Sequence, residues 1–350
     1  MIRALIFVCA SFFLSALLVT GGTFWMFHSA LEQPLQLEQE QPLIVAEGAT
    51  PRTLIHELEQ EGIIEGALWL RLMWRFQQHT PAVQVGEYAM VPGMTMQDLL
   101  DKWHTGDMIQ HRITLVEGWT FARFRKALAD NEVLEHTLAD HSNERIMEEL
   151  GRSGVHPEGR FYPDTYQFTR GQTDLDILRK AGKRLEEVLA EEWEKRSEKL
   201  PYKTPDDALV MASIIEKETG VASERPAIAG VFVRRLDMGM LLQTDPTVIY
   251  GMGDAYQGRI TRADLQRPTA YNTYVNAGLP PTPIAMVGRE AIHAALHPEE
   301  GDALYFVAKG DGSHQFSRTL QEHNNAVRKY QLKRRADYRS SPAPVAAESD

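Results

Sequence analysis

The first residues of the chain place the strongest limit on what it can fold into. From Ala4 to Phe27 about 24 residues carry no charge ("ALIFVCASFFLSALLVTGGTFWMF"), which is enough for one helix to cross the core of a bilayer. The main alternative is a cleaved signal peptide, with Thr20-Gly21-Gly22 as the cleavage site. Because Phe24 to Phe27 continue the apolar run past that site, we predict an uncleaved transmembrane anchor.

The charges that flank this run predict its orientation. Arg3 and the amino terminus precede it, whereas Glu32, Glu38 and Glu40 follow it. Positive charge stays on the cytoplasmic side of a membrane helix. We therefore expect residues 1–3 in the cytoplasm and everything after about residue 28 on the other side.

Composition excludes several classes of protein. The chain has 350 residues, a length that suits two modest domains and an appendage. Its formal net charge of −11 argues against a nucleic-acid-binding protein, which usually presents a basic face. The single cysteine, Cys9, lies in the apolar run, so the rest of the chain has no disulfide, cysteine-metal site or cysteine nucleophile.

A short pattern occurs three times and indicates small α+β modules. Each copy is a β-like run, a Gly-x-Thr turn, and apolar residues four and eight positions after the threonine, as expected for a threonine-capped amphipathic helix. The copies are centred on Gly48-Ala49-Thr50, Gly93-Met94-Thr95 and Gly118-Trp119-Thr120.

These features predict an α+β chain with five parts. They are a cytoplasmic tip and transmembrane anchor (1–28), a polar stalk (29–41), a small module (42–110), a larger domain (111–335) and a disordered tail (336–350). In the larger domain we expect a buried helix that ends at Gly220, a second helix from Pro226, two strands around Gly310-Asp311-Gly312, and a last helix from Thr319 to the basic Lys333-Arg334-Arg335.

The segment "MASIIEKETG" (211–220) places two glutamates at the end of an oily helix. Helical spacing puts Glu218 on the stripe of Ile214 and Ile215, with Glu216 nearly opposite. A carboxyl group against an apolar surface has a raised pKa and can act as a general acid. The alternative is that Lys217 or Arg225 makes either glutamate a member of an ion pair.

Two downstream segments supply groups that suit a sugar-binding groove. Aromatic faces pack on pyranose rings, and amides or carboxylates bond their hydroxyl and acetamido groups. We predict such roles for Gln243, Asp245, Tyr271, Asn272 and Tyr274. The alternative is that these are ordinary structural turns. Glu117 and Asp164 are candidates for a second catalytic carboxylate, although both lie in turns where acidic residues are common.

No cofactor is expected. His314 and His323 lack an i,i+4 partner and a nearby cysteine, so we interpret them as hydrogen-bonding residues and predict no metal site.

Five segments together resemble the endolytic murein transglycosylases, a family of bacterial lytic transglycosylases with a single membrane span. They are "MASIIEKET", "LQTDPTVIYGMG", "AYNTY", "GLPP" and "YFVAKGDGSHQFSRTLQEHN", in the order of the family. The resemblance runs from the anchor to about residue 335. The chain departs from the family pattern at Thr282, where a glycine is frequent, and at "AMVGRE", where a proline-containing turn is frequent.

The resemblance implies an inner-membrane protein with a periplasmic LysM-like module and a catalytic domain. It implies a lyase that cleaves the β-1,4 bond between N-acetylmuramic acid and N-acetylglucosamine, leaves 1,6-anhydro ends and terminates or trims nascent strands. Glu218 matches the family's catalytic glutamate. Peptidoglycan glycan strands are the implied substrate, and penicillin-binding protein synthases are candidate partners. The alternatives are a hydrolytic muramidase that pairs Glu218 with Asp245 or Asp164, a non-catalytic peptidoglycan-binding scaffold, and a protein-only adaptor.

Overall fold

The structure is a computed structural model that describes residues 2–76 and 83–332. The predicted tail (336–350) and the basic residues 333–335 lie outside the described residues. The helices of the first third are α1 (Ile2–Leu31), α2 (Pro51–Gln60), α3 (Leu68–Phe76) and α4 (Met96–Thr105). Those that follow are α5 (Phe121–Ala129), α6 (Asn143–Glu149), α7 (Asp174–Glu194), α8 (Pro205–Glu218), α9 (Arg225–Asp237), α10 (Asp245–Met252), α11 (Arg262–Gln266), α12 (Arg289–Leu296) and α13 (Leu320–Val327).

The strands form two-stranded sheets, so the chain is a mixture of helix and short sheet, in agreement with the predicted α+β class. The strands are β1 (Gln41–Val45), β2 (Gly86–Met90), β3 (His111–Thr114), β4 (Thr165–Phe168), β5 (Tyr305–Ala308) and β6 (His314–Ser317). The pairs are β1–β2, β3–β4 and β5–β6. In the first pair Leu43 lies opposite Tyr88, and in the last Phe306 lies opposite Phe316.

The repeated Gly-x-Thr pattern has the predicted structure. Thr50, Thr95 and Thr120 each accept a hydrogen bond from the backbone N–H three residues later, at the start of α2, α4 and α5. The glycine two residues before each threonine has a positive φ, as at Gly93 with 86°. Such a backbone favours glycine because it has no Cβ.

The chain divides into two compact units, and residues 2–111 supply most of the first. Its core joins the inward faces of β1 and β2 to α2 and α4, with Leu54, Tyr88, Leu99 and Trp103 among the buried side chains. At the end of α1 the rings of Phe27 and Trp69 pack edge to face, 5.6 Å between centroids.

Residues 29–41 differ from the predicted free stalk. α1 continues to Leu31, and Leu35 is buried in the core of the first unit. The backbone N–H of Leu35 donates to Met94 O at 2.7 Å, and that of Gln36 to Ile63 O at 2.8 Å. The apolar Leu35 and Leu37 hold the polar segment on the first unit because burying them is more favourable than leaving them in water.

The helix α1 is compatible with a membrane anchor. Its stretch Cys9–Leu31 is long and apolar enough to cross a membrane, lies near the N-terminus, and is not buried against the rest of the chain. Large side chains such as Phe12 and Leu18 are exposed along it.

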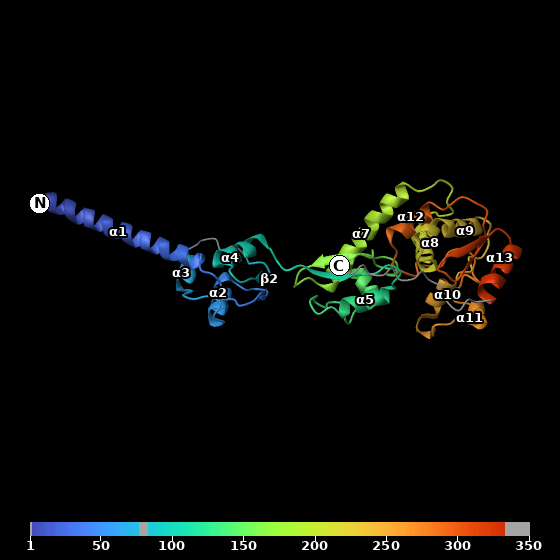
Figure 1. Cartoon of the computed structure of the whole chain (residues 1–350), viewed down its shortest axis with the longest axis horizontal. Coiled ribbons are helices and arrows are strands. Elements are labelled where there is room, and N and C mark those ends of the chain that lie inside the picture. Colours follow the sequence, from blue (N-terminus) through green and yellow to red (C-terminus); the bar gives the residue numbers. More distant parts are fainter. Residues whose placement is uncertain (1, 77–82, 333–350) are drawn as a thin grey trace. The chain divides into compact units, whose positions relative to one another are not determined.

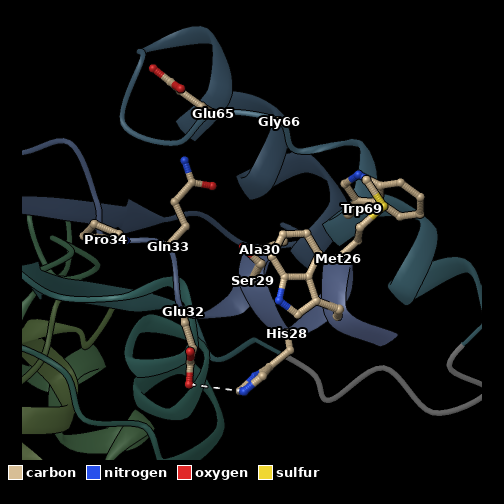
Figure 2. A pocket seen from close by; sticks show the side chains of 11 residues that line it. Met26, His28, Ser29, Ala30, Glu32, Gln33, Pro34, Glu65, Gly66 and Trp69 are labelled. Atoms are coloured by element: carbon tan, nitrogen blue, oxygen red, sulfur yellow. Dashed lines mark ion pairs between the residues drawn. The ribbon is translucent and has the colours of Figure 1, made fainter. Parts of the chain in front are cut away.

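A cavity of about 610 Å³ lies where α1 meets the first unit. Figure 2 shows apolar Met26 and Trp69 at one end of it and polar Gln33 and Glu65 at the other. His28 and Glu32 form an ion pair at its edge, 3.4 Å between Nε2 and Oε1. None of the predicted site residues lines this cavity.

The second unit holds α5 to α13 and is built around α8. Figure 1 shows α8, α9 and α12 close together, and the three pack against one another, with α7 and α10 also against α8. The residues of α8 from Ala208 to Ile215 are all buried. The β5–β6 hairpin packs on α9 through β5, and α13 packs on the hairpin. This arrangement fixes the last turn of α8, which carries both glutamates.

Candidate active site

Local sequence explains where α8 begins and ends. Thr204 and Asp207 form a capping box at its start, and Pro205 occupies its first position, where proline is well tolerated. The helix ends at Glu218, and Thr219 is extended. Gly220 therefore lies directly after the cap, where the prediction placed it, but the extended Thr219 ends the helix without a left-handed glycine.

Glu218 lies in this last turn, and among the residues that the structure describes one hydroxyl is its hydrogen-bond partner. Thr244 Oγ1 donates to Glu218 Oε1. Burial raises the pKa of Glu218 to about 7, Asp245 adds repulsion in the same direction, and the bond from Thr244 opposes both. The negative end of a helix also disfavours an anion at this place. The carboxyl group is thus able to hold and exchange a proton near neutral pH.

Glu216, two residues earlier, is held by charged and backbone groups instead. Its side chain is buried, with Oε1 at 3.5 Å from Arg225 Nη2, and its Oε2 accepts from Gly288 N at 3.2 Å. Burial raises its pKa, and Arg225 opposes that rise. The ion-pair alternative is therefore correct for Glu216 and not for Glu218, since no ion pair of Glu218 occurs within the described ranges.

The reason that we gave for separating the two glutamates is only partly correct. Residues on both faces of α8 are buried, so an oilier stripe does not distinguish Glu218. The distinction comes from the partners that surrounding loops bring to each carboxyl group. Lys217, between them, points elsewhere and donates to Gly118 O at 3.1 Å.

Three of the predicted sugar-binding residues are tied to Glu218 through a short network. Thr244 is the residue before α10, without a side-chain capping bond, and Asp245 is the first residue of that helix. Tyr274 Oη donates to Asp245 Oδ1 at 2.6 Å. Gln243 N donates to Thr273 O at 3.1 Å, and Gln243 has a positive φ of 53°. The segments around 243–245 and 273–274 therefore form one polar surface next to the carboxyl group of Glu218.

Asn272 has a structural position instead. It is 1% exposed. Its amide group donates to the carbonyls of Asp264, Leu265 and Arg267, and its Oδ1 accepts from Tyr274 N at 2.9 Å. The amide nitrogen has no donor left for a sugar, so Asn272 shapes the loop that carries Tyr274, and a direct contact of Asn272 with a sugar stays a prediction.

Tyr271 contacts other residues through both its hydroxyl group and its ring. Its hydroxyl is 2.8 Å from Thr282 Oγ1, the residue at which the chain departs from the family pattern. Its ring meets Tyr250 edge to face, 4.8 Å between centroids. A sugar contact by the remaining face of Tyr271 stays a prediction.

Sequence reasoning missed Glu158. This residue is 3% exposed, and burial raises its pKa to about 7. Its Oε1 accepts from Phe121 N at 3.0 Å, and its Oε2 accepts from Tyr250 Oη at 3.1 Å. A single glutamate in a loop has no spacing signal, and both partners are distant in the sequence.

The remaining acidic and histidine candidates contact residues other than Glu218. The carboxylate of Glu117 lies so close to Gly288 that any side chain at position 288 would overlap it. The charge of Glu117 raises the pKa of Glu216. Asp164 Oδ1 accepts from Thr165 N at 2.7 Å. His314 Nδ1 lies 2.7 Å from Glu224 Oε2, and His323 stacks on Tyr305. The described contacts of these residues do not include Glu218.

Comparison with known proteins decides the family. The model of the YceG-like family matches residues 43–329, which is most of the chain.

The chain belongs to the YceG-like family.

Two relatives of this YceG-like chain share one functional name. The chain is 30% identical over 332 residues to a Bacillus subtilis protein named endolytic murein transglycosylase, and the match covers 89% of this chain and 91% of the relative. A Streptococcus pneumoniae protein of that name is 24% identical, with 91% of this chain and 64% of the relative covered. The family resemblance inferred from the five sequence segments is therefore confirmed.

A solved structure supports the same assignment of the YceG-like chain. The crystal structure of a putative yceG-like protein from Listeria monocytogenes is 30% identical and superposes with a TM-score of 0.51. The match covers 83% of this chain and 99% of that one.

Proposed function

We propose that this YceG-like protein is a membrane-anchored lytic transglycosylase of peptidoglycan. The names of the Bacillus and Streptococcus relatives support the reaction class. The observation that carries the proposal is the carboxyl group of Glu218, whose pKa burial raises to about 7 and whose one hydrogen-bond partner within residues 2–76 and 83–332 is the hydroxyl of Thr244.

The reaction proposed is cleavage of the N-acetylmuramic acid–β-1,4–N-acetylglucosamine bond within a glycan strand. Protonated Glu218 donates its proton to the glycosidic oxygen, and the bond from that oxygen to C1 of the muramoyl residue breaks. The 6-hydroxyl of the same residue attacks C1, and the carboxylate of Glu218 accepts the hydroxyl proton. The products are a 1,6-anhydro end and a free 4-hydroxyl, and Glu218 is protonated again. One carboxyl group suffices because no water is activated, unlike the two-carboxylate glycosidases.

Gln243, Asp245 and Tyr274 are proposed to position the sugar, since each lies in the network around Thr244 and Thr273. Tyr271 is proposed to add an aromatic face. The first unit, within our predicted boundaries of 42–110, is proposed to be a LysM-like module that holds the glycan.

The cellular arrangement belongs to the same proposal. Residues 4–27 anchor the protein in the inner membrane, the N-terminus is cytoplasmic, and the catalytic domain (111–335) is periplasmic. There it trims or terminates nascent strands, with penicillin-binding protein synthases as candidate partners.

Mass spectrometry of products tests the reaction. The full-length protein in detergent is incubated with purified peptidoglycan, and the soluble fragments are weighed. Anhydro products absent from a Glu218→Gln incubation are expected. Products heavier by one water would instead establish a hydrolytic muramidase. Binding without fragments would establish a scaffold, and absence of glycan binding would favour a protein-only adaptor.

A further inference from the structure

A second cluster of chemically capable side chains lies between the ends of α7 and α12. Glu192 comes from α7, and His293 and His297 are four residues apart at the end of α12. Residues with this spacing share one face of a helix. One ligand atom from each of the three residues lies within 4.8 Å of the other two. None of these residues has a role in the proposed reaction.

One ring nitrogen of His297 has no hydrogen-bond partner among the described residues. Its Nδ1 lies 3.3 Å from Ser197 Oγ. Its Nε2 is buried, and none of the described residues is within hydrogen-bonding distance of it. A buried polar atom without a partner is costly. A proton on Nδ1, donated to Ser197, leaves a lone pair on Nε2, and this is the common arrangement of a metal-binding histidine and its outer partner.

The other two residues are also oriented. Arg289 Nη1 donates to Glu192 Oε1 at 2.7 Å, which leaves Oε2 turned toward His293 at 2.8 Å from its Nδ1. The two imidazole rings lie side by side, 4.2 Å between centroids. Glu191 also bonds Arg289, at 2.7 Å. Lys195 and Arg184 also act on Glu191, so the ligand atoms of the cluster, and not an excess of negative charge, favour a metal ion.

We propose that Glu192, His293 and His297 bind a divalent transition-metal ion, with Zn²⁺ as the first candidate, and that the ion clamps α7 to α12. Two imidazoles and one carboxylate suit Zn²⁺, whereas Mg²⁺ and Ca²⁺ prefer oxygen ligands. Water completes the fourth position. Because α12 packs against α8, the clamp stabilises the helix that carries Glu218 without entering the reaction. This proposal departs from our sequence prediction of no metal, which considered only His314 and His323.

Competition titration tests the site. The full-length protein in detergent is stripped with a chelator and titrated with Zn²⁺ against a chromophoric chelator. One equivalent is expected to bind, and His297→Gln and His293→Gln are each expected to weaken it by at least about tenfold. His136→Gln is the matched control, because His136 is exposed and outside the cluster. It is expected to bind as the wild type does.

Thermal melting separates metal binding from folding. The metal-free variants are expected to melt where the metal-free wild type melts, and Zn²⁺ is expected to raise the melting temperature of the wild type and of His136→Gln alone. His293 is exposed, so its replacement keeps the test valid if His297→Gln unfolds. A wild type that binds no Zn²⁺, or cluster variants that bind it as tightly as the wild type, would overturn the proposal.

Discussion

Two regions of the second unit hold a carboxyl group with a pKa raised to about 7, and they reach that value in different settings. Glu218 ends a helix, is half-buried, and accepts from one hydroxyl beside the acidic Asp245. Glu158 lies in a loop, is 3% exposed, and accepts from a backbone N–H and from a tyrosine. A raised pKa alone does not mark a catalytic acid, because access to the substrate is needed as well.

Replacing each carboxyl group in turn gives the largest expected difference. Glu218→Gln keeps an acceptor for Thr244 but cannot give up a proton, so we expect a loss of activity of about 1000-fold. Glu158→Gln is expected to keep most activity, since this carboxyl group does not reach solvent. The measurement is the rate of anhydro-product release, with circular dichroism to establish folding. Equal losses of activity in the two variants, both folded, would contradict the assignment of the catalytic acid to Glu218 alone.

The pH dependence of stability is the next largest effect. The pKa of Glu158 is about 7 in the folded protein, against an ordinary value of 4.5. Between these values the unfolded chain releases the proton and the folded chain keeps it, so rising pH favours unfolding. The full effect is about 3 kcal/mol, absent below pH 4.5 and complete above pH 7.

Glu158→Gln cannot ionise and is expected to remove this contribution. Melting temperatures of wild type and variant at pH 5 and pH 8 measure it, and the variant is expected to lose less stability between the two. The matched replacement Glu218→Gln is expected to change the slope in the same direction, because burial also raises the pKa of Glu218 to about 7. Unchanged slopes in Glu158→Gln would mean that Glu158 ionises normally.

The tyrosine that bonds Glu158 supplies a smaller effect. Tyr250→Phe removes the donor to Oε2 and is expected to destabilise the protein by about 1 kcal/mol. Tyr256→Phe is the control, since the Tyr256 hydroxyl makes no hydrogen bond with any residue that the structure describes. Chemical denaturation of both variants measures the difference. Equal stability of the two variants would show that this bond contributes nothing.

The smallest expected effects are two opposite shifts in the pH at which activity falls, caused by replacing two neighbours of Glu218. Activity should fall as pH rises through about 7, because the acid must begin protonated. Thr244→Val removes the bond that lowers the pKa of Glu218 and should move this fall to higher pH. Asp245→Asn removes the charge that raises the pKa and should move it to lower pH. Shifts in the same direction would contradict the assignment of the proton to Glu218.

The features that sequence analysis found are those determined by neighbouring residues. The Gly-x-Thr turns were predictable because Thr50 and its counterparts cap helices through bonds spanning three residues. The hairpin of β5 and β6 was predictable for the same reason. Glu218 was found through a family motif together with helical spacing, although its raised pKa comes from burial in the assembled fold and from Asp245, which follows much later in the chain.

The features that it missed depend on contacts between distant segments. Glu158 bonds Phe121 and Tyr250, and Glu192 meets His293 across two helices. Residues 29–41 look polar by composition, yet Leu35 packs on residues that follow much later. Burial of a polar side chain is a property of the assembled fold, so a single sequence does not reveal it.

One backbone angle has a consequence for how this enzyme would change under selection. Gln243 adopts a left-handed conformation, which costs a residue with a Cβ about 1 kcal/mol compared with glycine. Selection for thermal stability alone would be expected to favour glycine at position 243. Selection for turnover would be expected to keep Gln243, because we propose that its side chain positions the sugar. At this residue thermal stability and substrate binding therefore favour different side chains.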